Sequence, residues 1–417
     1  MANAFAQDAV ILQLWLYFRY MKLIWELPMS FGLQLQPHHR VFAAFGLHAF
    51  GMGSIFPRMP DIKAAMGVGE STLGLSLIGL PIGTLAALTF AAPLLERIGF
   101  RRTLLAVLPL VTLAYAIAVH ATQPLVFFLL LLPVGALIGC VEIIVNVEAD
   151  RTEALINKRI MNRAHAFWSF GFFAAGLYGA TMAQLGISPQ AQLALVVLFS
   201  GTAVALCLGQ FQPAPTRVVE SDSAKPIFAM PTWPILILVG VTLSACLMEG
   251  AGIDWSAIYM HNVFSSGPFL AGSAVAVGAL LQAVARYFAD GFIDQHSPSG
   301  VARFLLWVLG AGIFLVFLAL SPIVSLIGFG LIGIGTSAMF PLAISAAAQR
   351  TDRSSAVNVA AFVQIAFTVF LIGPPLLGSI AERWGVAWAF GIGMPLVVLS
   401  LFSAGALGNK RHGEAIA

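Results

Sequence analysis

The chain has 417 residues, of which 59% are hydrophobic and only 9% are charged, against roughly 25% charged in soluble domains. A water-soluble protein of this length could not cover its surface with so few charges, so the composition excludes a soluble enzyme and predicts a membrane protein. The net charge of +3 gives no indication of nucleic-acid binding. Cys140, Cys207 and Cys246 lie in apolar runs without metal-ligand spacing, and we expect them to be buried, with no metal and no cofactor.

Apolar windows of about 20 residues, the length that crosses a bilayer, recur along the chain. They predict an all-α membrane protein with twelve transmembrane helices. The expected spans are 41–59, 72–94, 103–121, 125–148, 164–186, 190–211, 233–260, 268–292, 304–320, 323–346, 357–380 and 385–407.

Basic residues alternate between the joins of these helices. Under the twelve-helix topology, all but three of the 21 Lys and Arg residues lie on one side of the membrane, the exceptions being Arg58, Lys63 and Arg383. Cytoplasmic loops carry the excess of Lys and Arg. The crowded side is therefore predicted to be cytoplasmic, together with both termini.

The longest interior connection is rich in Pro and divides the chain into two pseudo-symmetric six-helix bundles. Gly51-Met52-Gly53 in the first half is echoed by Gly250-Ala251-Gly252 in the second, and repeated halves with a site between them recur in transporters. The predicted boundaries are 40–211 and 232–408 for the bundles, 212–231 for a flexible cytoplasmic linker, and 409–417 for a cytoplasmic tail. Residues 1–39 do not fit this plan, and are either an interfacial helix or the product of a start placed too early.

The window 125–148 contains a carboxylate and an amide, Glu142 and Asn146, four residues apart. This spacing places both side chains on one face of a helix. An ionised carboxylate at bilayer depth costs at least about 3 kcal/mol, so Glu142 should face a polar cavity or bind a proton. Glu148 lies on another face and is expected to form a surface ion pair with Arg151.

The window 233–260 carries a second carboxylate, Glu249, followed by Gly250 and Gly252. These glycines would allow the helix to break beside Glu249, which is either a second proton or substrate site or a structural partner. Asp254 and Trp255 are expected near the outer mouth, with Trp255 either in the cavity or anchored at the membrane interface.

The loop after the second window reads Glu96-Arg97-x-Gly99-x-Arg101-Arg102 and resembles the signature of the major facilitator superfamily. Ala92 replaces the leading glycine of that signature, and Phe100 intrudes before the basic pair. The resemblance implies a conformational latch on the cytoplasmic side. Its residues would be Glu96, Arg97, Gly99, Arg101, Arg102, and, at the matching place in the second half, Asp290 and Asp294.

Within that superfamily the sequence is similar to the bacterial YbjJ-like inner-membrane permeases over residues 40–408. Six motifs carry the similarity: Arg58-x-Pro60, Glu142-x-x-x-Asn146-x-Glu148, His165-x-x-x-Ser169-x-Gly171, Glu249-Gly250-x-x-x-Asp254-Trp255, Phe340-Pro341-Leu342-x-Ile344-Ser345-Ala346-Ala347 and Gly373-Pro374-Pro375-Leu376-Leu377-Gly378. A more distant similarity is to fucose-permease-type symporters, whose coupling carboxylates lie in the first and fourth helices. Here Glu142 matches the fourth-helix residue, and the first helix offers only His48.

Two sets of candidate site residues follow. The proton-coupling candidates are Glu142, Glu249, His165 and His48. The two carboxylates are included because of their depth in the bilayer, and the two histidines because His changes charge most easily near neutral pH. The substrate-cavity candidates are Asn146, Trp168, Ser169, Asp254, Trp255 and Gln364.

We therefore expect a non-enzymatic, monomeric secondary transporter in a bacterial inner membrane, which moves a small polar solute together with protons. No nucleotide-binding Gly-x-x-x-x-Gly-Lys-Ser/Thr loop is present in the sequence, which argues against energy from ATP. The alternatives are a proton-coupled drug or metabolite exporter, and a membrane sensor that keeps the fold without transport.

Overall fold

The computed structural model describes residues 19, 31–158, 160–215 and 230–408, and this part of the chain is helical, without strands. The chain divides into two compact units. Unit 1 takes its described residues from 19, 31–68, 76–158 and 160–215, and unit 2 takes them from 69–75 and 230–408. The expected extension 1–39 and tail 409–417 therefore lie largely or wholly outside the described residues.

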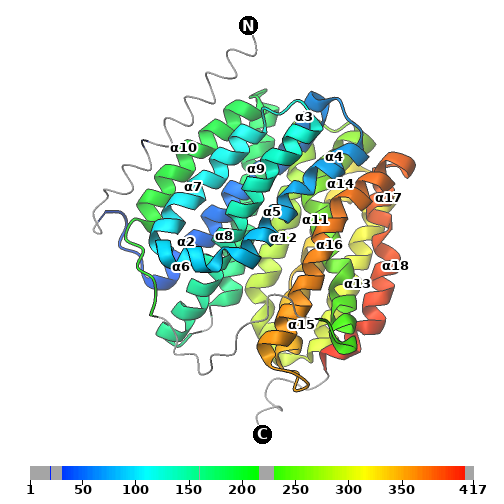
Figure 1. Ribbon diagram of the computed structural model, residues 1–417. Coiled ribbons are helices and arrows are strands. Elements are labelled where there is room, and N and C mark those ends of the chain that lie inside the picture. Colours follow the sequence, from blue (N-terminus) through cyan, green and yellow to red (C-terminus); the bar gives the residue numbers. More distant parts are fainter. Residues whose placement is uncertain (1–18, 20–30, 159, 216–229, 409–417) are drawn as a thin grey trace. The chain divides into compact units, whose positions relative to one another are not determined.

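The helices of unit 1 are α2 (Pro37–Gly53), η1 (Phe56–Arg58), α3 (Met59–Met66), α5 (Gly79–Phe90), α6 (Ala92–Ile98), α7 (Phe100–Ala118), α8 (Pro124–Ile156), α9 (Met161–Gln184) and α10 (Pro189–Leu208) (Figure 1). Those of unit 2 are α11 (Trp233–Phe264), α12 (Pro268–Gln295), α13 (Pro298–Leu318), α14 (Pro322–Thr336), α15 (Met339–Ala348), α16 (Ser355–Trp384), α17 (Val386–Gly391), α18 (Gly393–Ser403) and η2 (Ala404–Leu407). Between them, α4 (Glu70–Leu77) begins in unit 2 and ends in unit 1.

Ten helical segments in the described chain are long and apolar enough to cross a membrane. The two expected spans without such a segment are 41–59 and 164–186. The first corresponds to α2, which has only 17 residues, the lower limit for crossing a bilayer. The second corresponds to α9, whose first turns carry Asn162, Arg163 and His165. The count of twelve and the cytoplasmic termini remain predictions.

The break that Gly250 and Gly252 would allow does not occur in this structure, because α11 runs through both residues without interruption. Glycine permits a break but does not impose one, and the flanking residues of α11 are good helix formers. The helix expected over 323–346 is the one that breaks, between Thr336 at the end of α14 and Met339 at the start of α15.

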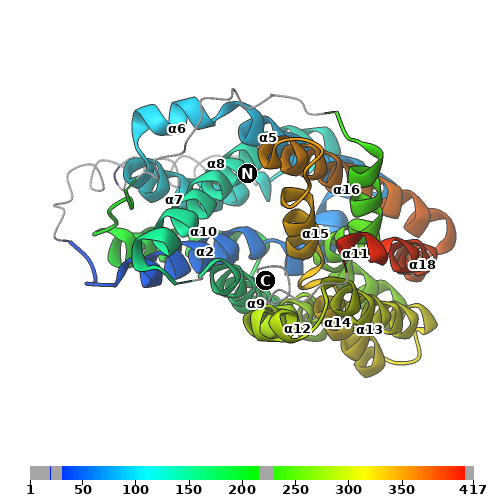
Figure 2. The same ribbon diagram turned by 90° about the horizontal axis from the view of Figure 1, so that it is seen from below.

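Small residues bring pairs of helices close together in each unit. In unit 1, α5 packs on α8, and a Cβ atom added to Gly83 or Gly135 would lie 2.0 Å from the Leu132 carbonyl oxygen or 1.9 Å from that of Leu80. In unit 2, α12 packs on α14, as the two views of Figures 1 and 2 also show. Helix association in a membrane depends on such close packing, because lipid gives no hydrophobic drive.

Unit 2 includes the short segment 69–75, which packs on α16. The backbone N–H of Ser71 donates a hydrogen bond to Glu382 Oε2 at 2.7 Å. A Cβ atom on Gly378 would lie 2.5 Å from the carbonyl oxygen of Glu70. The first turn of α4 therefore belongs to the packing of unit 2, while α5, which follows it, belongs to unit 1.

Candidate functional site

The polar cluster of unit 1 joins α8 to α2. His48 Nε2 lies 3.2 Å from Glu142 Oε1, and Asn146 Nδ2 donates to Glu142 Oε2 at 3.0 Å and to the Glu142 carbonyl oxygen at 2.9 Å. The two α8 residues meet because they are four positions apart on one helix. The cluster therefore contains a carboxylate held by an imidazole from a neighbouring helix and an amide from its own.

The two titratable groups differ in their access to solvent. The His48 side chain is fully buried, whereas 29% of the Glu142 side chain is exposed. The second ring nitrogen of His48, Nδ1, is buried without a hydrogen-bond partner in the described chain. Glu142 is therefore the partly exposed member of the pair, and His48 lies fully buried behind it.

The first turns of α9 lie near this cluster. His165 packs edge-on against Phe45 with ring centroids 5.1 Å apart, and it is within electrostatic range of Glu142. Ser169 is fully buried. Trp168 stacks on Phe172 at 5.1 Å and is only half-buried. Of the α9 candidates, His165 and Trp168 are thus the ones with access to the cluster or to solvent.

The polar cluster of unit 2 lies where α14 ends. Arg286 Nη2 and Gln282 Nε2, both on α12, donate to Glu249 Oε1 on α11 at 3.0 and 2.8 Å. Gln282 also donates to Thr336 Oγ1 at 3.2 Å, and Arg286 Nε donates to the Ser337 carbonyl oxygen at 3.0 Å. The guanidinium thus neutralises Glu249 and also satisfies a carbonyl left without a helical donor at the break.

Sequence reasoning missed Arg286 and Gln282 as partners of Glu249. Arg286 and Asp290 are four residues apart in the sequence, a spacing that predicts a pair within one helix; the Asp290 side chain lies outside the described part of the structure. The available signal was the spacing of Gln282 and Arg286, which are four residues apart and therefore share one face of α12.

The expected surface ion pair of Glu148 is wrong in its location. Glu148 does approach Arg151, with Oε1 3.5 Å from Nη1, but only 2% of Glu148 is exposed. Its other oxygen, Oε2, accepts the backbone N–H of Ala214 at 3.0 Å. Glu148 thus anchors the first residues of the predicted linker 212–231, which the sequence alone indicated to be flexible. Residues 216–229 of that linker lie outside the described residues.

The cavity candidates of unit 2 occupy different environments. Trp255 is fully buried, so it lines neither a cavity nor the membrane interface in this conformation. Asp254 lines a small cavity between α11 and α16. Gln364 is half-buried on α16, where its carbonyl oxygen accepts from Thr368 Oγ1 at 3.1 Å. The three residues are therefore not gathered into one site.

The loop that resembles the superfamily signature joins α6 to α7. Gly99 makes the turn with φ +90°, a conformation that favours glycine. Arg101 Nη2 donates to the Gly209 carbonyl oxygen at 2.6 Å, just beyond the end of α10, where a cation complements the helix dipole. Glu96, Arg97 and Arg102 are exposed. The side chains of Asp290 and Asp294 lie outside the described part of the structure, so the latch role remains a prediction.

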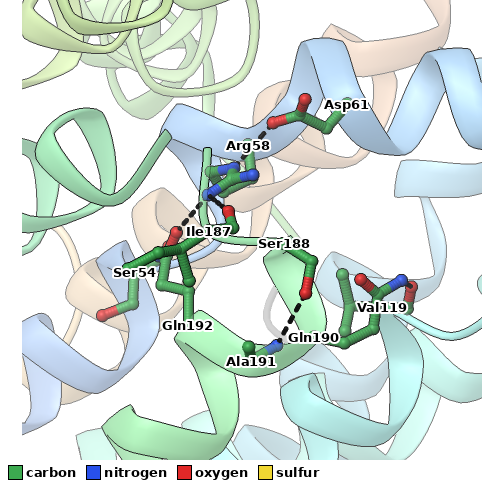
Figure 3. A network of polar contacts seen from close by, with 9 residues as sticks. All are labelled: Ser54, Arg58, Asp61, Val119, Ile187, Ser188, Gln190, Ala191 and Gln192. Atoms are coloured by element: carbon green, nitrogen blue, oxygen red, sulfur yellow. Dashed lines mark hydrogen bonds and ion pairs between the residues drawn. The ribbon is translucent and has the colours of Figure 1, made fainter. Parts of the chain in front are cut away.

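A buried arginine, Arg58, lies just beyond the C-terminal end of α2 and forms a second polar network (Figure 3). The sequence indicated no role for it beyond its motif. Arg58 is 3% exposed. Its Nε donates to Asp61 Oδ2 at 2.6 Å, and its Nη1 donates to the Ile187 carbonyl oxygen and to Gln192 Oε1 at 2.9 and 2.8 Å. Gln192 Nε2 in turn donates to the Ser54 carbonyl oxygen at 2.9 Å. These contacts tie α2, α3 and the join before α10 together.

The apolar helices and the buried ionisable clusters define a helical multi-pass membrane protein, of the kind that moves polar solutes or ions. The model of the Major Facilitator Superfamily matches residues 41–371, and the chain belongs to this superfamily of membrane transporters. The superfamily and the relatives below point to transport rather than to an enzymatic reaction.

Three curated relatives are similar over most of their length. An uncharacterized MFS-type transporter of Yersinia pestis is 26% identical over 84% of this chain and 90% of its own. The uncharacterized transporter y4wD of Sinorhizobium fredii is 28% identical over 84% of this chain and 92% of its own. The membrane protein MosC of Rhizobium meliloti is 23% identical over 79% and 80%.

Among solved structures, two crystal structures of the nucleoside transporter NupG resemble this fold. One has a TM-score of 0.68 at 11% identity and covers 89% of this chain and all of NupG. The other has a TM-score of 0.63 at 12% identity and covers 89% of this chain and 98% of NupG. At these identities the likeness establishes the fold alone.

Proposed function

We propose that the protein is a secondary active transporter that takes up a small polar solute together with protons, by alternating access, across a bacterial inner membrane. The observation that carries this proposal is the contact between His48 and Glu142 at 3.2 Å, between two helices of unit 1.

The His48–Glu142 pair is suited to binding and releasing one proton. With His48 protonated and Glu142 ionised, the two groups form an ion pair. Removing one proton leaves a neutral His48 beside a negative Glu142, and adding one leaves a positive His48 beside a neutral Glu142. Asn146 donates to Glu142 Oε2, and this bond can persist when a proton arrives, because a protonated carboxyl keeps acceptor capacity. A proton added to the other oxygen, Oε1, instead changes its contact with His48 Nε2 on α2. Proton binding is therefore linked to a change in the contacts between α2 and α8.

Glu249 is less suited to this role because its partner is Arg286. Arginine stays protonated in proteins, so adding a proton to Glu249 would leave a half-buried guanidinium without its counter-charge. Removing one partner of such a pair costs about 3–5 kcal/mol. The contrast favours Glu142 as the coupling carboxylate and Glu249 as the fixed counter-ion of Arg286.

The test uses purified protein in proteoliposomes that contain a pH-sensitive dye. A panel of sugars, amino acids, nucleosides and organic cations is added outside, and a transported solute is detected by acidification of the interior. For that solute, Glu142→Gln should still exchange labelled for unlabelled solute across the membrane, because glutamine mimics the protonated carboxylate. Accumulation driven by a proton gradient should be lost.

The control is Asp150→Asn, which removes an exposed carboxylate from the same helix and should accumulate the solute like the unmodified protein. Accumulation by the Glu142→Gln protein at the unmodified rate would remove Glu142 from the mechanism. Acidification by no solute, together with outward movement of a preloaded one, would favour export instead.

A further inference from the structure

The helices α11 and α16 enclose a small cavity within unit 2. Its volume is about 20 Å³, enough for about one water molecule. Asp254 contributes the one charged side chain of the residues that line it, and apart from the thiol of Cys246 the other lining side chains are apolar. The cavity therefore presents a single carboxyl group in otherwise apolar surroundings.

The Asp254 carboxyl group has no hydrogen-bond or ion-pair partner within the described chain. It lies ten residues before the end of α11 at Phe264, about 15 Å along the helix axis, and its side chain is half-buried. The other acidic, basic and histidine side chains described on α11, on α12, on α16 and in the segment 69–75 lie outside the cavity lining; they are Glu249, His261, Arg286, Glu382, Arg383 and Glu70.

An ionised carboxylate in such surroundings is unfavourable unless a positive charge lies beside it, and otherwise the group becomes neutral by keeping a proton. Glu249, five residues earlier on the same helix, has Arg286 as its counter-ion. Asp254 has none, and one carboxyl group with room for one water does not supply the several oxygen ligands that a metal cation needs. A proton is therefore the positive charge that fits this site.

The space beside Asp254 depends on small residues and prolines of the two helices. Gly250, one turn before Asp254 on α11, has no side chain, and a Cβ atom there would lie 3.7 Å from the Phe370 ring. Pro374 and Pro375 lie inside α16, and because proline has no N–H, the carbonyl oxygens four residues before them lack their usual helical donors. Bending of α16 beside the cavity therefore breaks fewer helical hydrogen bonds than bending elsewhere, and it changes the room for water at Asp254.

We propose that Asp254 is a proton-binding site of unit 2. Its carboxyl group carries a proton in the present conformation, takes that proton from water, and returns it to water when the space between α11 and α16 admits enough water to solvate the carboxylate. This site goes beyond the transport proposed above and does not require the His48–Glu142 pair. Together with that pair, it gives the protein one place for a proton in each unit.

The site is tested by infrared spectroscopy of the full-length protein in lipid. A protonated carboxyl group has a C=O stretching band at a frequency where neither an ionised carboxylate nor an amide absorbs strongly. The spectrum of the unmodified protein minus that of Asp254→Asn should contain this band at neutral pH, and the band should disappear at alkaline pH. The same difference should appear when both proteins also carry Glu142→Gln, so the result is independent of solute transport and of the pair in unit 1.

Two results would overturn the proposal. One is a carboxylate band in place of the C=O band at neutral pH, which would mean that Asp254 is ionised there. The other is a C=O band that persists at every alkaline pH at which the protein stays folded, because a carboxyl group that never releases its proton is only a structural group.

A second variant leaves the carboxyl group in place and covers the case in which Asp254→Asn does not fold. Gly250→Ala adds a methyl group to the cavity, and less room for water disfavours the ionised form, so the C=O band should persist to a pH higher by on the order of one unit. The matched control is Gly252→Ala on the same helix, whose Cβ would have no atom within 4 Å and which should leave the titration unchanged. Identical titrations in the two glycine variants would also overturn the proposal.

Discussion

The buried Arg58 network gives a prediction whose size can be worked out from the structure. Replacing Arg58 with Met keeps the length of the side chain but removes its donors. Two acceptors then lose their hydrogen bonds, the carbonyl oxygen of Ile187 and Oε1 of Gln192, and Gln192 is fully buried. Each buried acceptor left unsatisfied costs about 1–3 kcal/mol. Asp61 is 47% exposed and can be solvated instead.

The expected destabilisation by Arg58→Met is therefore about 3–5 kcal/mol, in the range measured when one partner of a buried charged contact is removed. Thermal unfolding of the purified protein in detergent, followed by intrinsic tryptophan fluorescence, would show a lower unfolding temperature. The control is Lys158→Met, which removes an exposed cation elsewhere in unit 1 and should change stability by at most about 0.5 kcal/mol.

A double substitution separates a network from a set of independent contacts. In Arg58→Met with Gln192→Leu, both the donor and its buried acceptor are replaced by apolar groups, which is far less costly than removing one alone. The loss in the double variant should be smaller than the sum of the two single losses by about 1–3 kcal/mol. Strict additivity, or an unfolding temperature of Arg58→Met equal to that of the unmodified protein, would refute the reasoning.

Three further predictions concern other parts of the chain. Gly135→Ala should destabilise unit 1 by about 1–3 kcal/mol, because the added Cβ atom would lie 1.9 Å from a carbonyl oxygen of α5. Gly252→Ala, whose Cβ would have no atom within 4 Å, should be neutral or stabilising by up to about 1 kcal/mol. Thermal unfolding of the two variants measures both changes. Glu148→Gln weakens the hold on the linker and should speed amide hydrogen exchange at Ala214, with unchanged exchange contradicting the anchoring role. Hydrogen bonds from Arg350 hold the pKa of Asp352 below its usual value of 3.8. The ionised Asp352 therefore stabilises the protein above pH 3.8, and this stabilisation is lost as the pH falls through the lowered pKa. The difference in unfolding temperature between Asp352→Asn and the unmodified protein should shrink on acidification in the same range.

Local periodicity was enough to predict part of the candidate site. Glu142 and Asn146 meet because a helix brings residues four positions apart to one face, and no tertiary information is needed for that. The partner His48 could be named only as a candidate, since the sequence does not say which face of α2 packs on α8. The ten apolar segments were likewise predictable, because the length and hydropathy of a membrane span are properties of the segment itself.

The errors concern contacts that form between segments. Glu148 was placed at the surface because Arg151 follows it by three residues, but the chain beyond α10 folds back to bring Ala214 against it. The pairing of Glu249 with Arg286 likewise requires α11 and α12 to lie together at a particular rotation. The break between Thr336 and Met339 could have been anticipated from Pro341, which has no N–H for the Ser337 carbonyl oxygen four residues earlier. The sequence did not indicate that Arg286 satisfies this oxygen from another helix.

The segment 69–75 has a consequence for any attempt to divide the protein. Because these residues pack within unit 2, the polypeptide passes between the units at residues 68–69 and 75–76 as well as through the linker. A fragment that starts at the linker would contain the helices α11 to α18 of unit 2 but would lack residues 69–75, which pack on α16. The backbone around Gly378, which approaches Glu70 in the intact chain, would be uncovered in that fragment. Separately produced halves should therefore depend on each other for solubility, and a permuted chain that keeps 69–75 with the second half should not.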